Sequence, residues 1–338
     1  MSIKKYTRVI LKFRTLQSSL KAVLLLVSFV VAFPINAEEA FLTPESGGRD
    51  YLMQGEFTGI IDAWGGAYAA QSIALGNDEF TIVLFAGGLP GDGYRQEVEK
   101  KSITTKADGK TVRGIGHGYS VKIEGQLLTV SDERGKVLGE LQKVQRQSPT
   151  LGLKPTSKDA LMLFDGTNVN AFRNGGLMEE KFLGVGCETT EKFGNHHLHL
   201  EFRTPFMPTA RGQKRGNSGL YLQARYEVQI LDSFGLDGKD NECGGIYKVS
   251  EPKVNMCFPP LVWQTYDIDF TAAKYDSESV KIQNARVTIR QNGVVIHEDL
   301  ELPTQTPGKY KEANEPGPLF LQDHHDPVVF RNIWLVKK

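Results

Sequence analysis

The sequence has little of what a nucleic-acid-binding protein needs. Its 338 residues hold 40 Lys and Arg against 40 Asp and Glu. Six of the cations and none of the acids lie in residues 1–37, so the remainder carries a net charge of about −6. A mildly acidic protein is a poor partner for nucleic acid, because phosphate binding needs clustered Lys and Arg.

Long apolar runs are missing as well. The run from Ala22 to Phe33 has about 12 residues, short of the roughly 20 that span a bilayer. A basic stretch precedes it and a small residue, Ala37, follows it, which is the pattern of a secretory signal peptide cut after Ala37. An uncleaved signal anchor is the alternative. We expect an exported protein, in the periplasm or at the cell surface, with no stable membrane insertion after cleavage.

Cysteine is scarce, with three residues in the chain. No CxxC or HxxxH spacing is present, so the usual metal-binding motifs are absent from the sequence. Cys243 and Cys257 lie 14 positions apart, and in an oxidising compartment we expect them to form a disulfide. Closing a loop of that size would stabilise the fold by about 3 kcal/mol. Cys187 is then the odd cysteine, expected to be buried and inert.

Glycine-rich turns and short strands divide the chain into domains. We predict a signal peptide over 1–37, a small β domain over 48–146, a linker over 147–158 and a second domain over 159–338. The glycines of Gly87–Gly93 indicate a turn rather than a phosphate site, since no Lys-Ser/Thr follows them.

The second domain has many short strands and no long helical period, which predicts an all-β fold. Asn292-Gly293 is a strong hairpin signal between two of its strands. We expect a β-sandwich of the jelly-roll kind beside the smaller N-terminal β domain. Its strands are predicted over 197–203, 263–270, 285–291, 294–298, 319–323 and 328–336.

The most informative segment runs from Asn217 to Phe234 and predicts two adjacent strands. In the second strand Glu227 and Gln229 alternate with Val228 and Ile230, so the polar pair faces away from the core. A row of carboxylate, carboxamide and tyrosine side chains favours a face that binds something polar. We expect that face to collect Tyr221, Gln223, His197, His199, Glu201 and Arg203, with Gln322 and His324 as a further pair.

Seven motifs in order resemble a known family, the 3-keto-disaccharide hydrolase domain, over about residues 159–337. The resemblance implies the two-sheet fold of concanavalin A-like lectins and glucanases, with a concave sugar-binding face. It also implies cleavage of sugars whose C3 hydroxyl has been oxidised to a ketone. It carries no assigned catalytic set onto this chain. The motifs are Leu163–Thr167, Asn217–Gly219, Tyr226–Gln229, Trp263–Asp267, Asn292-Gly293, Leu321–His324 and Arg331–Trp334.

A C3 ketone would change the chemistry of glycosidic cleavage. The ketone acidifies the proton on C2, so a base can remove it and the group on C1 can then leave. That route needs a base, stabilisation of an enolate at O3 and an acid for the leaving oxygen. Direct hydrolysis instead needs two carboxylates, about 5–5.5 Å apart for retention or 6.5–9.5 Å for inversion.

Glu227 is the first candidate for a catalytic or sugar-anchoring carboxylate, against the alternative of a solvated strand residue. His324 is the candidate general acid or base, because its unperturbed pKa of about 6.5 suits proton transfer; the alternative is a turn histidine. Glu201 or His324, from other strands, is expected to pair with Glu227 in catalysis. The expected sugar-binding residues are Gln229, Gln322, Asp232, Tyr221, Gln223 and His199.

The row His197, His199 and Glu201 contains metal-ligand side chains at alternate positions, although one H-x-H pair is a weak signal. We assign no metal ligands; a divalent ion would nevertheless suit enolate stabilisation. The predicted function is cleavage of 3-keto-glycosides by hydrolysis or elimination, with carbohydrate as the partner. A non-catalytic, lectin-like surface protein is the alternative, and a purely structural domain is the third, because fold does not decide function.

Overall fold

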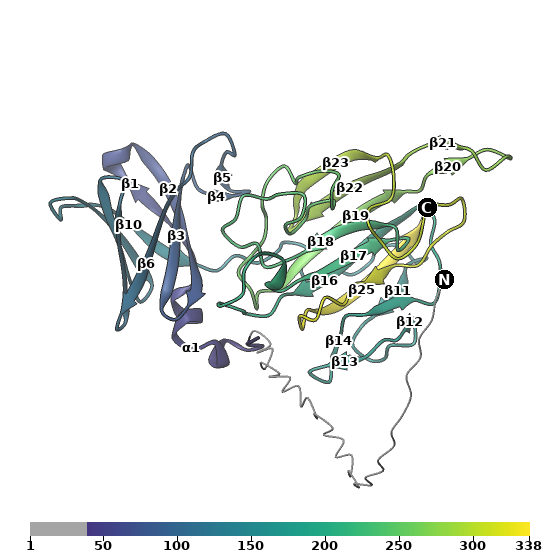
Figure 1. The fold of residues 1–338 in the computed structure, drawn as a ribbon, viewed down its shortest axis with the longest axis horizontal. Coiled ribbons are helices and arrows are strands. Elements are labelled where there is room, and N and C mark those ends of the chain that lie inside the picture. Colours follow the sequence, from purple (N-terminus) through teal and green to yellow (C-terminus); the bar gives the residue numbers. More distant parts are fainter. Residues whose placement is uncertain (1–38) are drawn as a thin grey trace, which may run out of the picture. The chain divides into compact units, whose positions relative to one another are not determined.

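The structure is a computed structural model that describes residues 39–338; the predicted signal peptide lies outside the described residues. The described part forms one compact unit that is almost entirely β, which confirms the predicted fold class. Both β regions lie in this unit (Figure 1). In residues 39–338 no helix has the length and apolar character needed to cross a bilayer.

One helix, α1 (Pro44–Met53), precedes the strands and was not predicted. Its start has a clear local cause. Thr43 lies at the N-cap, its hydroxyl accepts a hydrogen bond from the Ser46 backbone N–H at 3.3 Å, and Pro44 occupies the first turn. A capping box followed by proline in the first helical turn is a sequence pattern that indicates a helix start.

The first β region is a closed barrel of eight antiparallel strands in the order β1-β10-β9-β8-β7-β6-β3-β2. Its interior is packed with apolar side chains such as Phe57, Val121 and Leu141, so it is a core and no pore. The strands are β1 (Gly55–Ile61), β2 (Gly66–Gly76), β3 (Glu79–Ala86), β6 (Lys101–Asp108), β7 (Thr111–Gly116), β8 (Tyr119–Glu124), β9 (Leu127–Asp132) and β10 (Val137–Val144).

The second β region consists of two sheets that pack face to face through one apolar core. The larger sheet has the order β13-β14-β25-β16-β19-β22-β23, with β11 beside β25. Its strands are β11 (Leu161–Phe164), β13 (Leu177–Met178), β14 (Phe182–Leu183), β16 (His196–Arg203), β19 (Gln264–Thr271), β22 (Ala285–Gln291), β23 (Val294–Leu302) and β25 (Val329–Lys337).

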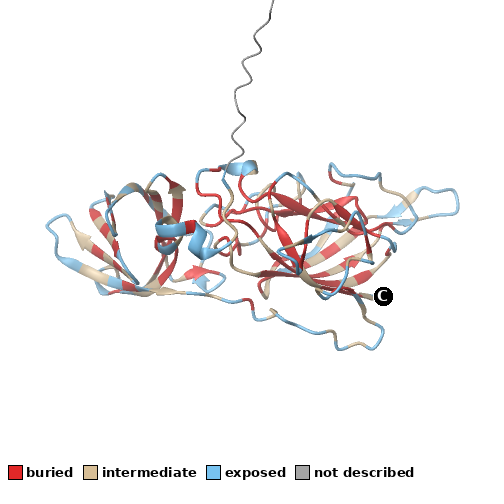
Figure 2. Cartoon of the chain, turned by 90° about the horizontal axis from the view of Figure 1, so that it is seen from below, coloured by how far each residue is buried: buried red, intermediate tan, exposed pale blue. Residues whose placement is uncertain are grey.

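The smaller sheet carries the candidate site and has the order β12-β15-β24-β17-β18. Buried residues run along the strands of both sheets, and exposed residues gather in the connections (Figure 2). The strands of the smaller sheet are β12 (Phe172–Arg173), β15 (Cys187–Thr189), β24 (Phe320–Leu321), β17 (Ser218–Leu222) and β18 (Tyr226–Ile230). Short elements complete the described residues: η1 (Asp62–Trp64), η2 (Gly212–Lys214), β4 (Leu89–Pro90), β5 (Gly93–Tyr94), β20 (Lys274–Tyr275) and β21 (Lys281–Gln283).

The predicted Asn-Gly hairpin is present between β22 and β23. Asn292 and Gly293 have φ angles of 50° and 81°, the left-handed values that a two-residue hairpin turn of this kind requires. Strand β23 continues to Leu302, four residues beyond the predicted end at Glu298. Strand β24 is shorter than predicted, because only Phe320 and Leu321 pair with neighbouring strands.

Candidate functional site

The alternation predicted for β18 is confirmed. Val228 and Ile230 lie in the core between the sheets, so Glu227 and Gln229 project from the outer face of the smaller sheet. Strand β17 repeats the pattern, because Leu220 lies in the core and Tyr221 is the cross-strand partner of Glu227.

A single cross-strand row runs over this outer face. Arg173 pairs with Glu188, Glu188 with Phe320, Phe320 with Tyr221, and Tyr221 with Glu227. The row covers four strand spacings of about 4.8 Å, or about 19 Å. The sheet therefore presents a continuous line of charged and aromatic side chains with Glu227 at one end.

Glu227 is a buried carboxylate. It is 4% exposed, and its Oε1 lies 2.6 Å from the position that a Cβ on Gly219 would occupy. The lack of a side chain at Gly219 thus creates the space for the carboxylate. Burial raises the pKa of Glu227 to about 7, although a hydrogen bond from Tyr221 acts in the opposite direction. Its pKa thus lies near neutral pH, where the group can accept or release a proton.

Tyr221 and Gln322 surround that carboxylate. The Gln322 Nε2 donates to the Tyr221 hydroxyl at 3.1 Å, and that hydroxyl also lies 3.2 Å from the Pro307 carbonyl. The Gln322 backbone N–H donates to the Gly219 carbonyl at 2.8 Å. Gln322 Oε1 is 3.3 Å from the same hypothetical Gly219 Cβ. Glu227 and Gln322 therefore converge above Gly219, as two residues predicted for one site should.

The candidate site extends from Gln229 through the carboxamide side chains of two further residues, Gln213 and Asn217. The Gln229 Nε2 donates to Gln213 Oε1 at 3.1 Å, and the Gln213 Nε2 donates to the Asn241 carbonyl at 2.7 Å. The Asn217 Nδ2 donates to the Gln213 carbonyl at 2.7 Å. Gln213 and Asn241 were missed by sequence reasoning, because they lie in connections with no periodic pattern.

Three side-chain oxygens among these carboxamides are buried without a hydrogen-bond partner: Gln229 Oε1, Gln322 Oε1 and Asn217 Oδ1. A buried acceptor without a donor costs about 1–3 kcal/mol. Hydroxyl groups of a sugar are donors that could satisfy such acceptors. The arrangement is thus suited to binding a polyhydroxylated ligand beside a group that can exchange a proton.

Two connections contact the row and its neighbouring backbone: residues 303–319 between β23 and β24, and residues 231–263 between β18 and β19. Thr306 Oγ1 accepts from the Glu227 backbone N–H at 2.9 Å, and Lys309 forms an ion pair with Glu188 at 2.8 Å. From the other connection, the Tyr247 backbone N–H donates to the Glu227 carbonyl at 3.4 Å. Residues 306–309 therefore lie beside β18 and contact side chains of the row, and the Tyr247 bond is made at the free edge of β18.

His324 lies in the connection between β24 and β25, two residues after Gln322, and is exposed. Its connection is held by Asp323 Oδ1, which accepts from the His325 backbone N–H at 2.8 Å, and by Asp326, which accepts from the Asn217 backbone N–H at 2.7 Å. Its chain position is thus next to the site, and its role as general acid or base stays a prediction.

The expectation that Glu201 and His199 share a face with Glu227 is wrong. Leu198, Leu200 and Phe202 of β16 fill the core from the opposite sheet. Their alternate neighbours therefore project from the far side of the larger sheet, and the two sheets separate Glu201 from Glu227. Strand alternation assigns a side chain to one face of its own sheet and does not say which sheet that is.

Glu201 and His199 belong to a buried network under residues 147–156. His199 Nδ1 bonds Asp267 at 2.6 Å, Arg331 donates to Glu201 at 2.7 Å, and the Gly152 backbone N–H donates to Glu201 at 2.6 Å. Desolvation opposes protonation of His199, but hydrogen bonds to both carboxylates outweigh it and raise the His199 pKa. The contacts are those of a structural network.

Gln223 and Asp232 also have structural partners. Gln223 lies in the turn after β17, donates to the Phe193 carbonyl at 2.9 Å and accepts from Arg225 at 3.0 Å. Asp232 forms an ion pair with Arg215 at 2.7 Å. Each holds a turn or connection next to the site, and neither is shown to face a ligand.

The predicted disulfide is not formed in the structure: Cys187, Cys243 and Cys257 are free and buried. Cys243 and Cys257 are nevertheless neighbours: their thiols are hydrogen-bonded to each other beneath the candidate site. Cys243 Sγ also lies 3.4 Å from the Tyr266 hydroxyl. The structure thus brings the two thiols together, and their disulfide in an oxidising compartment stays a prediction.

The histidine row does not assemble a metal site. Among residues 39–338 no group of three or more His, Cys, Asp or Glu side chains gathers as ion ligands would. His197 pairs with Asp269 at 3.1 Å and His199 with Asp267, so each ring has its own carboxylate.

Comparisons with known proteins extend this picture. Residues 159–336 match the family described as the 3-keto-alpha-glucoside-1,2-lyase-like domain. No curated protein matches the chain.

Three crystal structures of candidate glycosyl hydrolases from Parabacteroides distasonis ATCC 8503 are also similar. The first is 32% identical with a TM-score of 0.48, over 54% of this chain and 84% of that one. The second is 16% identical with a TM-score of 0.37, over 52% and 92% of the two chains. The third is 19% identical with a TM-score of 0.36, over 53% and 99%.

Proposed function

The chain belongs to the 3-keto-alpha-glucoside-1,2-lyase-like domain family, and on that premise we propose that it cleaves glycosidic bonds of 3-keto-glycosides. Family membership supports a carbohydrate-active protein. The specific proposal depends on one observation, a buried carboxylate with a pKa of about 7 beside unpartnered carboxamide oxygens.

Glu227 acts in this proposal as the general base. Its carboxylate removes the proton from C2, which the C3 ketone has made acidic. The electron pair of the C2–H bond forms a C1–C2 double bond, and the C1–O bond breaks. The leaving oxygen takes up a proton, for which His324 remains our candidate donor. Gln229 and Gln322 orient the sugar through its hydroxyl groups.

The spacing of carboxylates along the row favours elimination over direct hydrolysis. Hydrolysis needs a second carboxylate within about 10 Å of the first. The next carboxylate along the row, Glu188, lies three strand spacings from Glu227, or about 14 Å, and is paired with Lys309 at 2.8 Å. Elimination needs one carboxylate as the base, together with hydrogen-bond donors for the enolate at O3 and an acid for the leaving oxygen.

The test is turnover of a 3-keto-disaccharide and of its unoxidised parent by residues 38–338, followed by mass spectrometry. We expect cleavage of the keto sugar alone, with products that lack the added mass of water. Glu227→Gln should lower kcat by about 10²–10⁴, as for loss of a general base. Glu188→Gln, on the same row, is the matched control and should keep most of the activity.

Other outcomes would redirect the proposal. Products with added water indicate hydrolysis. Saturable glycan binding without turnover indicates the lectin-like alternative, and no binding of either sugar indicates a structural domain. Wild-type turnover by Glu227→Gln would exclude Glu227 as the base.

Export is also part of the proposal. We infer that the protein acts outside the cytoplasm after residues 1–37 are removed, on the support of the basic, apolar and small-residue pattern of that segment.

A further inference from the structure

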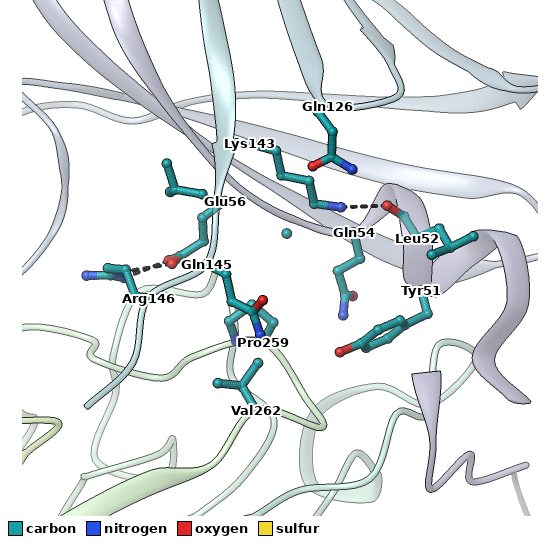
Figure 3. A pocket seen from close by; sticks show the side chains of 12 residues that line it. Tyr51, Leu52, Gln54, Glu56, Gln126, Lys143, Gln145, Arg146, Pro259 and Val262 are labelled. Carbon is teal, nitrogen blue, oxygen red and sulfur yellow. Dashed lines mark hydrogen bonds and ion pairs between the residues drawn. The ribbon is translucent and has the colours of Figure 1, made fainter. Parts of the chain in front are cut away.

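A cavity that is separate from the candidate site lies against the barrel. It has a volume of about 270 Å³ and is formed where α1 leads into β1 and where β10 ends, with Pro259 and Val262 as an apolar wall (Figure 3). This volume is near the lower limit for small-ligand pockets, about 300 Å³, so a ligand of one sugar ring suits it better than a polymer.

Gln54 supplies an unused hydrogen-bond donor to this cavity. Its side chain is 97% buried, being 3% exposed, and its Oε1 accepts from the Ala74 backbone N–H at 3.1 Å. Its Nε2 is buried and has no partner. Because the Ala74 bond determines which way the amide points, the free N–H groups remain available to an acceptor in the cavity.

Lys143 supplies an unpaired positive charge. Its Nζ donates to the Leu52 carbonyl at 2.5 Å (Figure 3). The same Nζ lies 5.8 Å from the centroid of the Phe57 ring. The bond to Leu52 closes the last turn of α1 and uses one of three N–H donors.

The neighbouring carboxylate cannot neutralise Lys143, because it is already occupied. Glu56 receives two bonds from Arg146, at 2.6 and 2.8 Å, and a third from Gln71 at 2.9 Å. The lining therefore carries Lys143 and Arg146 against a single acid, and the surplus charge lies at Lys143.

We propose that this cavity binds one anionic sugar unit, a hexuronate, with its carboxylate on Lys143 and Gln54. The ring would lie against Pro259 and Val262. Its hydroxyls would meet Gln126, Gln145 and the Tyr51 hydroxyl, which line the cavity in Figure 3. The barrel would then recognise acidic glycans, independently of any chemistry at Glu227.

The experiment is calorimetric titration of the protein with D-glucuronate and, as the uncharged counterpart, D-glucose. It is run at pH 6, where Lys143 is protonated, since burial lowers its pKa to about 8. We expect saturable binding of glucuronate and at least tenfold weaker binding of glucose. Lys143→Met, which keeps the apolar stem, should weaken glucuronate binding at least tenfold. Lys110→Met, an exposed lysine in the turn between β6 and β7 of the same barrel, should leave binding unchanged.

Gln126→Ala is a second variant at the exposed rim, should Lys143→Met fail to fold, and we expect it to weaken binding about threefold. The proposal is overturned if glucuronate does not bind, if glucose binds equally well, or if the pocket variants bind glucuronate like the wild type. Cleavage of the 3-keto-disaccharide is measured separately, so failure here leaves the proposed function intact.

Discussion

At the residue scale, one proton of Tyr221 has two competing acceptors. Its hydroxyl is hydrogen-bonded to Glu227 and also lies 3.2 Å from the Pro307 carbonyl. Whenever it donates to Glu227 it stabilises the carboxylate and offsets part of the desolvation that raises the Glu227 pKa. Tyr221 therefore adjusts the basicity of the proposed base without being the base.

Tyr221→Phe tests that adjustment. A base works as its carboxylate, so kcat/KM should rise as pH rises through the Glu227 pKa of about 7. Loss of the hydroxyl removes the influence that lowers this pKa, so the rising limb should move to higher pH. Tyr310→Phe is the control, because its hydroxyl bonds Glu188 at 3.2 Å instead. A limb that moves to lower pH would contradict the assignment.

Gly219→Ala tests the space above β17. The added Cβ would stand 2.6 Å from Glu227 Oε1 and 3.1 Å from the Tyr221 ring, so the carboxylate must move. A displacement of this kind should lower kcat by about 10–100-fold with little change in Tm. Gly194→Ala is the control, since its Cβ would meet nothing within 4 Å. Equal kcat values for the two variants would show that the position of Glu227 is unimportant.

At the element scale, residues 147–156 act as a cover for the outer face of the larger sheet. The Leu153 carbonyl accepts from Trp334 at 2.9 Å and from Asn332 at 3.0 Å, and Thr150 donates to Asp267 at 2.7 Å. A segment predicted as a linker from its composition is thus bound along β25 and β19. Its role is to bury the network around Glu201.

Glu201→Ala should therefore cost stability and leave catalysis unchanged. Removing the carboxylate takes away the ion-pair partner of Arg331 and the acceptor of the Gly152 backbone N–H, at about 3 kcal/mol. Desolvation opposes ionisation of Glu201, but bonds from His199, Asn332, the Gly152 N–H and Arg331 outweigh it and lower the pKa to about 2. The stabilisation is hence present above the unfolded pKa of about 4.5 and is lost as pH falls toward 2.

Urea unfolding at pH 7 and pH 3, with kcat/KM measured alongside, would check this. The difference between Glu201→Ala and wild type should shrink at pH 3. A large loss of kcat/KM with unchanged stability would restore Glu201 as a catalytic candidate.

At the scale of the whole molecule, the two cores share side chains. Phe206, which follows β16, is fully buried within the barrel core cluster and forms a backbone bridge with Phe41. Phe234, which follows β18, packs with Ile73 and Phe85 of the barrel. The family match begins at residue 159, yet two aromatic residues within it are buried by barrel residues.

Residues 159–338 produced alone should therefore be less stable than residues 38–338. Exposing each phenylalanine costs about 1.5–3 kcal/mol, which lowers Tm by on the order of 10 °C for this size. Thermal unfolding of the two proteins measures the difference. Phe206→Ser and Phe234→Ser together should improve the solubility of the protein that consists of residues 159–338. Equal Tm values for residues 159–338 and 38–338 would contradict the shared core.

Sequence reasoning succeeded where the cause is local. The all-β fold follows from short alternating strands, and the Asn292-Gly293 hairpin from a turn that few other residue pairs allow. The outward position of Glu227 and Gln229 follows from Val228 and Ile230 on the same strand. The helix at Pro44 was missed although its Thr43 cap was readable.

The remainder depended on long-range pairing, which no local pattern encodes. His199 and Glu201 alternate as clearly as Glu227 does, but β16 joins the other sheet, so the same pattern leads to the opposite side of the core. Gln213 reaches the site from a connection, and Gln54 and Lys143 meet from segments about 90 residues apart. The sequence by itself determined which side chains leave each strand's apolar face. Only the tertiary structure decided which of them meet, because hydrogen bonding between distant strands and packing across the core select the partners.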